Sequence, residues 1–259
     1  MLLLLSALAP SPRAAISRPC VSRLRVQPAA AVAMQATGNV AEDSDALHAS
    51  DQIDALFEML ASADATDDEL AWRIARAHHD KAEELQSDDK QREKLLREGL
   101  AVACASMERT GGSNGYALKW YAILLGRLGD FLPTKEKVAN SFKIKDSLEA
   151  SARLLPDDAS VLTALGQWCF KVAGISGPER FAAKLLFGSP PQSSYAEALG
   201  FLEKSYELRP SKKAALFAGL CQGKLGERAD AREWMERCLA LESSTAAAVE
   251  LDRQAQAAL

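Results

Sequence analysis

The side chains with the most obvious capacity for chemistry are two adjacent histidines and a run of three acids. His78 and His79 are neighbours, so in a helix they point about 100° apart and cannot hold one metal ion together. Asp67, Asp68 and Glu69 stand where a helix is expected to begin, and acids there interact favourably with the helix dipole. A solvated or capping role is predicted for the histidines, with no metal bound, and a helix-start position is predicted for the acids.

Patterns that carry catalysis or cofactor binding are absent from the sequence. HExxH, P-loop and GxSxG motifs do not occur. The run of glycines in residues 111–115 lacks the strand and helix that flank a dinucleotide loop, so it predicts a break between helices. We therefore expect a protein that is not an enzyme and that uses no cofactor.

The cysteines predict structure and not reactivity. There are five of them, an odd number, and no two have CxxC spacing. Four of the five fall within apolar helical patterns, which is typical of small buried hydrophobes in a reducing compartment. The five are Cys20, Cys104, Cys169, Cys221 and Cys238.

Two groups of basic residues are the candidates for partner binding. Each group contains one acid, and both lie on a chain that is acidic overall. They could form a patch that attracts acidic protein tails or anionic lipid headgroups, or they could be an ordinary solvated helix face. The first group is Lys135, Lys137, Lys143 and Lys145, and the second is Lys171, Arg180 and Lys184.

The charge distribution argues against general nucleic-acid binding. The net charge is −4, yet residues 1–41 hold four arginines and no acid, which leaves −8 on the rest. A domain of that sign cannot neutralise phosphates over a broad surface. Nucleic acid is therefore not an expected partner.

The first 49 residues predict a targeting leader followed by a flexible linker. The stretch to residue 33 is rich in Arg, Ser and Ala without acids, a composition typical of an organellar transit peptide. Two alternatives stay open: a short apolar signal, residues 2–5, before a cleavable site, or a disordered tail. Residues 34–49 are polar and acidic and predict the linker. No later run reaches the ~18 apolar residues of a membrane span.

Repeated helix pairs are the predicted scaffold for residues 50–259. Residues 148–156 and 202–210 share Leu, Glu, Ser, Leu and Pro at an offset of 54, and residues 235–241 keep part of this pattern after a further 33. The second offset fits a tetratricopeptide repeat. The fold class is therefore all-α, a tetratricopeptide-like α-solenoid of stacked helical hairpins with a disordered N-terminal leader. We expect about nine or ten helices, stacked with a concave face.

Small and large residues in these helices indicate how they pack. Three helices, residues 117–128, 161–172 and 214–225, each carry a glycine where a neighbouring helix is expected to approach closely: Gly126, Gly166 and Gly219. Trp120 and Trp168 lie near two of these glycines, and core packing is favoured over lining a groove. Ala231 completes the small-large-small spacing of the last repeat.

Residues 174–194 form an insertion that generic repeats lack. Phe181, Leu185, Leu186 and Phe187 give it an apolar side beside Arg180 and Lys184. Such a helix could lie on a membrane surface or fold back onto the solenoid, and the second is favoured because an exposed apolar patch is a liability.

Several stretches together resemble the regulator of microtubule dynamics family. They are LAWRIARA at 70–77, KWYAILLG at 119–126, KVANSFKIK at 137–145, RFAAKLLF at 180–187 and PPQSSY at 190–195. The resemblance covers about residues 50–257. It implies an α-helical tetratricopeptide-like domain that associates with microtubules and spindle poles, with some relatives acting as membrane-anchored organelle tethers.

The expected function is non-catalytic binding of protein partners, namely microtubules or a microtubule- or spindle-associated complex. The alternative is an organelle-localised lipid-binding, tethering or assembly scaffold, with an anionic membrane surface as partner. The corresponding locations are the cytoplasm, in association with microtubules or the spindle, or a mitochondrion or plastid if residues 1–40 are a transit peptide.

Overall fold

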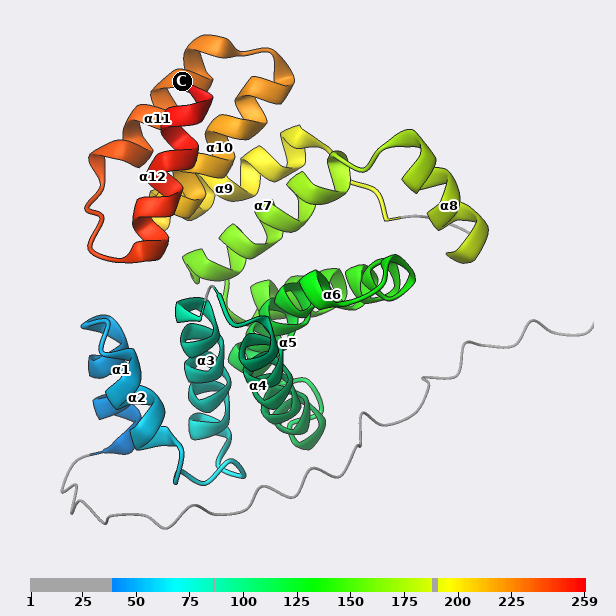
Figure 1. The fold of residues 1–259 in the computed structure, drawn as a ribbon. Coiled ribbons are helices and arrows are strands. Elements are labelled where there is room, and N and C mark those ends of the chain that lie inside the picture. The colour runs from blue at the N-terminus through cyan, green and yellow to red at the C-terminus, as the bar shows by residue number, and fades with distance from the viewer. Residues whose placement is uncertain (1–38, 86, 188–190) are drawn as a thin grey trace, which may run out of the picture.

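The structure, a computed structural model, describes residues 39–85, 87–187 and 191–259, and all regular elements there are helical (Figure 1). This confirms the all-α prediction; the predicted leader, residues 1–38, lies outside the described residues. The elements are α1 Val40–Ala49, α2 Ile53–Leu60, α3 Asp68–Glu84, α4 Asp89–Arg109, α5 Gly115–Leu128, a 3₁₀ turn Gly129–Phe131, α6 Thr134–Leu154, α7 Ala159–Ala173, α8 Gly177–Phe187, α9 Tyr195–Leu208, α10 Lys212–Leu225, α11 Arg228–Ala240 and α12 Ala246–Ala258.

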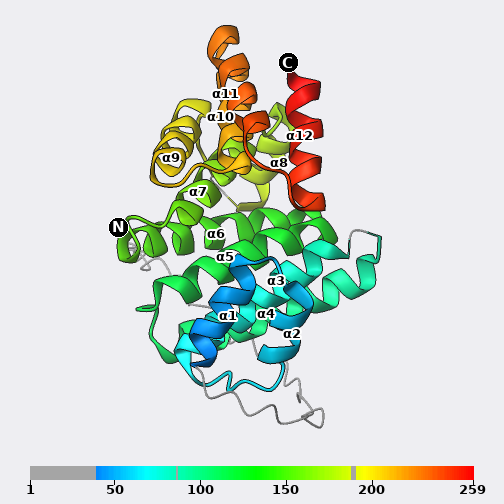
Figure 2. The ribbon, with the colours of Figure 1, turned by 90° about the vertical axis from the view of Figure 1, so that its left-hand side faces the viewer.

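The α-helices of the described residues stack as antiparallel pairs. α3 packs with α4, α5 with α6, α7 with α9 and α10 with α11, while α12 closes the C-terminal end. α1 and α2 cover α3 at the other end (Figure 2). α8 is inserted between α7 and α9 and lies against α6 (Figure 1). We call α1–α6 the N-terminal lobe and α7–α12 the C-terminal lobe.

The predicted linker is wrong for residues 40–49, which form helix α1. Asn39 caps this helix by accepting a hydrogen bond from the Ala41 amide, and Glu42 and Asp43 occupy its first turn, where acids are favourable. Ser44 is fully buried against the rest of the domain. The polar composition hid a short capping helix, of which Val40 and Leu47 also pack on the core. This helix helps raise the number beyond the nine or ten expected.

The acidic run at residues 67–69 and the adjacent histidines, His78 and His79, have structural roles. The acidic run begins α3 as predicted, with Asp68 and Glu69 in the first turn, and Asp67 caps the helix by accepting from the Glu69 amide. The solvated role predicted for His78 is wrong, because this ring lies between α2 and α4 and its Nδ1 donates to the Ile74 carbonyl at 2.8 Å. Burial lowers the pKa of His78.

Close helix crossings are made at two of the three predicted glycines. A Cβ on Gly166 would stand 2.5 Å from Leu202 Cγ and 3.1 Å from the Ala198 carbonyl oxygen. A Cβ on Gly219 would stand 2.8 Å from Met235 Cε and 3.1 Å from the Ala231 carbonyl oxygen. These positions let α7 and α9, and α10 and α11, approach closely.

The expected close approach is absent at Gly126. A Cβ there would meet only Ile144 Cδ1 at 3.8 Å among the described residues, which is ordinary contact. Gly166 and Gly219 are each the eighth residue of their helix, and the eighth residue of α5 is the buried Ala122. Gly126 therefore lies four residues, about one turn, beyond the position in α5 that corresponds to the other two glycines.

Substituting these glycines should give opposite results. We expect Gly166→Ala to lower the free energy of unfolding by about 1–3 kcal/mol, because the added methyl group collides with Leu202 and with backbone. Gly126→Ala should be neutral or raise it by up to about 1 kcal/mol through helix propensity. Urea unfolding followed by circular dichroism measures both, and equal destabilisation would contradict this packing.

A second prediction concerns how the free energy of unfolding changes with pH. Because the folded state disfavours protonated His78, stability should be fully present above the unfolded pKa of about 6.5 and fall below it, by at most about 1.4 kcal/mol per pH unit. His78→Asn should flatten the dependence between pH 7.5 and 5.5, and His79→Asn serves as the matched variant. An unchanged slope in His78→Asn would refute the assignment.

Candidate functional site

The two lobes enclose a hollow of about 690 Å³, which we call the inter-lobe hollow. Its walls come from α1, α3 and α5 on one side and from the α6–α7 connection and the end of α9 on the other. Asn114 fixes the start of α5 by accepting from the amides of Tyr116 and Ala117. Tyr116, Lys119 and Ile123 are then spaced three and four residues apart and share the face that lines the hollow.

Aromatic rings form one wall of this hollow. Trp72 of α3 stacks on Tyr116 of α5, with ring centroids 4.6 Å apart, and Trp120 packs 5.3 Å from the ring of His79. Trp72 and Trp120 are 6% and 8% exposed. Neither indole N–H has a hydrogen-bond partner within the described part of the chain. Two buried donors on this wall are therefore unsatisfied.

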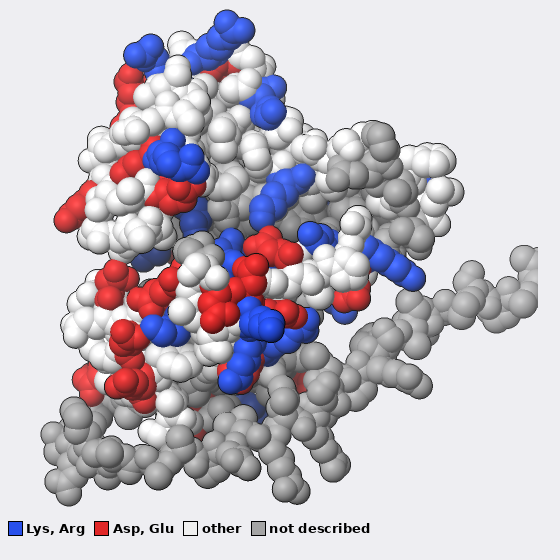
Figure 3. Space-filling view, in the orientation of Figure 1, with Lys and Arg blue, Asp and Glu red and all other residues white. Residues whose placement is uncertain are grey.

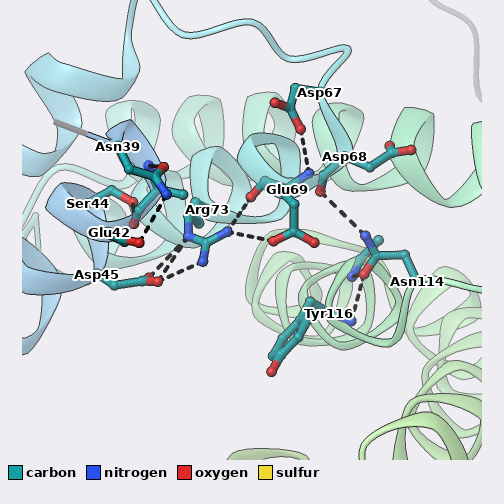
Figure 4. A network of polar contacts seen from close by, with 12 residues as sticks. Asn39, Glu42, Ser44, Asp45, Asp67, Asp68, Glu69, Arg73, Asn114 and Tyr116 are labelled. Carbon is teal, nitrogen blue, oxygen red and sulfur yellow. Dashed lines mark hydrogen bonds and ion pairs between the residues drawn. The ribbon is translucent and has the colours of Figure 1, made fainter. Parts of the chain in front are cut away.

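Two arginines of α3 flank the aromatic wall. The Cζ atom of Arg73 lies 4.0 Å from the Trp72 ring centroid, and both Arg73 and Arg76 bind Asp45 of α1, at 2.7 and 2.9 Å. Figure 4 shows Arg73 held between Asp45 and Glu69. Burial raises the pKa of Asp45, but the hydrogen bonds from both arginines outweigh it and hold that pKa below its ordinary value.

A buried ion pair forms the floor of the hollow and joins the lobes. Lys119 Nζ lies 2.7 Å from Asp158 Oδ2 and 3.2 Å from Ser160 Oγ. Asp158 also caps α7, because its other oxygen accepts from the amides of Ser160 and Val161. Burial lowers the pKa of Lys119, and Arg76 and Arg209 lower it further, while Asp158 opposes them.

A second polar cluster ties α1 to α3. Asp80 accepts a hydrogen bond from His79 Nδ1 at 3.0 Å, and His48 Nδ1 lies 3.0 Å from its other oxygen as an ion-pair partner. Burial raises the pKa of Asp80, but the two histidines more than offset it and keep the carboxyl ionised. His79 is thus fixed in place and also packs on Trp120.

Further charged groups from four helices face one another beyond the hollow. Arg127 of α5 donates to Glu83 of α3 at 2.9 Å. Lys171 of α7 and Lys213 of α10 both keep contact with solvent. Even so, desolvation by the helices around them lowers the pKa of both. Glu83 opposes this shift at Lys213, and Arg127 and Lys171 add to it. Figure 3 shows basic and acidic atoms intermingled where the lobes meet.

The predicted basic residues of α6 do not share one face. Lys135 and Lys137 are 200° apart around the helix, as are Lys143 and Lys145, since each residue turns it by 100°. Lys135, Lys137 and Lys143 are exposed. Lys145 is half-buried, 3.6 Å from Glu149 and 5.3 Å from the Trp168 ring centroid. The structure therefore offers exposed lysines around the start of α6 and not a single stripe.

The second basic group is divided between two places. Lys171 belongs to the groups between the lobes, whereas Lys184 is exposed on α8 and Arg180 reaches back to the Val172 carbonyl at 3.5 Å. Ala183 is buried, while Phe181 and Leu185 are 63% and 71% exposed. The favoured folding back of the insertion is therefore wrong for these two apolar side chains. Those of Leu186 and Phe187 lie outside what the structure describes.

The remaining packing residues lie inside the repeats. Trp168 is 7% exposed and its indole donates to the Ser141 carbonyl of α6 at 3.0 Å. Trp120 is equally enclosed but also lines the inter-lobe hollow, so packing and groove lining are not exclusive for it. Ala231 places its carbonyl against Gly219.

Cysteines and metal ligands add nothing to the site. Cys104, Cys169, Cys221 and Cys238 are buried without disulfides, and burial raises the pKa of Cys169 to about 11 and that of Cys221 to about 12. Across the described ranges, no three His, Cys, Asp or Glu side chains gather as metal ligands. None of the helices described there has the length and apolar character to cross a membrane.

Sequence reasoning missed the inter-lobe hollow. Its signal was the spacing of Tyr116, Lys119, Trp120 and Ile123 on one helix, an aromatic and basic face directly after a glycine-rich break. Arg76 could not be assigned, because its partner Asp45 lies in the segment taken for a linker.

Comparisons with known proteins agree on family and fold. The family described as "Regulator of microtubule dynamics protein 1-3" matches residues 40–259. "Regulator of microtubule dynamics protein 1" of Bos taurus is 34% identical over 201 residues, covering 76% of this chain and 63% of the relative. Its counterpart of Mus musculus is 33% identical over 232 residues, covering 87% and 74%. The match thus spans less than two thirds of the bovine protein's length.

A solved structure supports the repeat architecture. The thermophilic TPR protein TTC0263 of Thermus thermophilus superposes with a TM-score of 0.56 at 13% identity, covering 85% of this chain and 97% of that one. This likeness confirms the tetratricopeptide-like solenoid and concerns the fold alone. With the match over residues 40–259, the chain belongs to the regulator of microtubule dynamics protein 1-3 family.

Proposed function

We propose that this chain is a non-catalytic interaction module that binds microtubules or a microtubule-associated complex. The observation that carries the proposal is the family match over residues 40–259, which takes in every helix of the described residues. Relatives aligned over 76% and 87% of the chain are named regulators of microtubule dynamics. The corresponding location is the cytoskeleton.

The exposed lysines of α6 are the proposed contact with the filament. Lys135, Lys137 and Lys143 extend into solvent, and no ion pair holds them within the described part of the chain. Microtubules present acidic tubulin tails, so a local basic surface would be attracted even though the chain carries −4 overall. Because these lysines point in different directions around the helix, a flexible acidic tail can reach more of them than a flat partner surface can. Association should be fast and sensitive to salt.

The ionisable groups between the lobes support a binding role over a catalytic one. Lys119 is paired with Asp158, and Asp80 with two histidines, so these buried charges already have partners. Catalytic acids and bases are usually left poised near the working pH by their surroundings. Here the pairing with His48 and His79 holds the Asp80 pKa far below that range, although burial acts in the opposite direction.

A second candidate function is docking onto an anionic membrane as part of a tether. Its support is α8, where Phe181 and Leu185 are largely exposed on the same helix as the exposed Lys184. An apolar pair beside a cation is the composition of an interfacial helix.

Pelleting with microtubules tests the first proposal. Residues 39–259 should co-sediment with taxol-stabilised microtubules at low salt, and the bound fraction should fall several-fold at about 0.3 M salt because the attraction is electrostatic. Changing the exposed Lys135, Lys137 and Lys143 to Glu should weaken binding at least tenfold.

The matched control reverses three exposed basic residues of the other lobe. They are Lys204, Lys224 and Arg228. Both variants change the net charge equally, so an equal loss in both would assign the effect to total charge. Unbound protein at low salt would refute the proposal itself.

Flotation tests the membrane alternative. Phe181→Ser with Leu185→Ser should abolish binding to phosphatidylserine-containing vesicles, since the apolar contact is lost. Leu225→Ser with Val249→Ser is the control, because these side chains are also exposed but lie on α10 and α12. Binding that survives the α8 change, or no binding by the unaltered chain, would reject this alternative.

A further inference from the structure

The inter-lobe hollow has an apolar rim. Eight large hydrophobic side chains are exposed in the described part of the chain, and three of them, Tyr116, Leu154 and Leu208, line this one hollow. They are 36%, 46% and 41% exposed and come from α5, α6 and α9. Exposed apolar residues gathered from three elements around a cavity are typical of a binding surface.

Cations outnumber carboxylates around the same space. Arg76, Lys119 and Arg209 line the hollow, against Asp157 and Asp158. Lys119 and Asp158 pair with each other, which leaves Arg76 and Arg209 against Asp157. Arg209 is exposed, and the described residues supply it with no ion pair. His48 completes the ionisable lining and is paired with Asp80.

The three cations also act on one another. Arg76 and Arg209 both disfavour the charged form of Lys119. Arg76 shares its carboxylate partner, Asp45, with Arg73. An anion placed among these groups would relieve their mutual repulsion, since like charges in a partly enclosed space are weakly screened.

The wall is also short of hydrogen-bond acceptors. Three buried donors of lining residues, Arg76 Nε, Trp72 Nε1 and Trp120 Nε1, have no partner among the described residues. Both Trp72 and Arg76 are more than nine-tenths buried. Carboxylate oxygens accept without donating, so they fit a wall of this kind, and small side-chain shifts on binding would bring them within reach.

The shape and floor of the hollow favour a peptide as the source of those carboxylates. A volume of about 690 Å³ accommodates a few side chains and not a whole helix. An acyl chain would need an apolar channel, whereas the buried Lys119 and the half-buried Asp158 line this hollow. Asp157 would repel a doubly charged phosphate more strongly than a single carboxylate.

We propose that the inter-lobe hollow binds an acidic peptide segment in which carboxylates flank one aromatic or large apolar side chain. The carboxylates lie against Arg76, Lys119 and Arg209. The apolar side chain packs between Tyr116, Leu154 and Leu208. This site is separate from the lysines of α6, and the proposal does not depend on microtubule binding.

Fluorescence anisotropy with defined probes tests it on the full chain. The probes are fluorescein-labelled twelve-residue peptides with Glu-Glu pairs on both sides of a central Phe, Tyr, Trp or Leu. At least one should bind at micromolar concentration, and its affinity should fall at least tenfold when Glu is replaced by Gln or the central residue by Ser. If no acidic probe binds better than its Gln counterpart, the proposal is wrong.

Two exposed positions locate the site without threatening the fold. Arg209→Glu and Tyr116→Ser should each weaken binding at least tenfold with unchanged helical circular dichroism. Arg228→Glu is the matched control, an exposed arginine of α11 that lines no part of the hollow. Equal losses in Arg209→Glu and Arg228→Glu would overturn the assignment. So would binding of phosphatidylserine vesicles, and not peptides, that depends on Arg209 and Tyr116.

Discussion

The arrangement of the two lobes depends on the buried contact between Lys119 and Asp158. Lys119 comes from the inner face of α5, and Asp158 begins α7, so one pair links consecutive repeats across their junction. Each partner is also needed locally, because Asp158 satisfies the first amides of α7. Removing one partner of such a pair leaves an uncompensated charge and typically costs about 3–5 kcal/mol, although the pair as a whole adds little net stability. Its contribution is therefore to specify where the C-terminal lobe starts.

Once that junction is fixed, the hollow follows from ordinary repeat packing. The close crossing at Gly166 draws α9 onto α7 and carries Leu208 and Arg209 to the rim. Buried hydroxyls reinforce it, since Ser205 donates to the Ala159 carbonyl at 2.7 Å and Ser151 to the Gly115 carbonyl at 2.8 Å. Residues far apart in sequence thus meet because the helices cross at small side chains. This close packing fixes how far each helix can slide along its neighbour.

The repeats could be predicted from sequence because their signal is local and recurrent. Glycine at Gly166 and Gly219 marks helix crossings, and the same reasoning failed at Gly126 because in α5 the crossing position holds alanine, which carries no comparable signal. Helix α1 was missed for a different reason. Its apolar contacts with the core come from only Val40 and Leu47, within an otherwise polar stretch. Its main polar partners, Arg73 and Arg76, lie about thirty residues later, beyond the reach of periodicity.

Charge was the least predictable property, because a position in sequence does not tell which surface of a solenoid a side chain reaches. Lys143 and Lys171 look alike in the sequence, yet one extends from α6 into open solvent while the other stands among charges from three other helices. A lysine in open solvent is strongly screened and gains most from a long, flexible acidic partner. Groups between the lobes are screened less and can select a partner by shape as well as by charge. The same acidic chain can therefore carry two basic surfaces with different demands, and separate substitutions at α6 and at Arg209 can distinguish them.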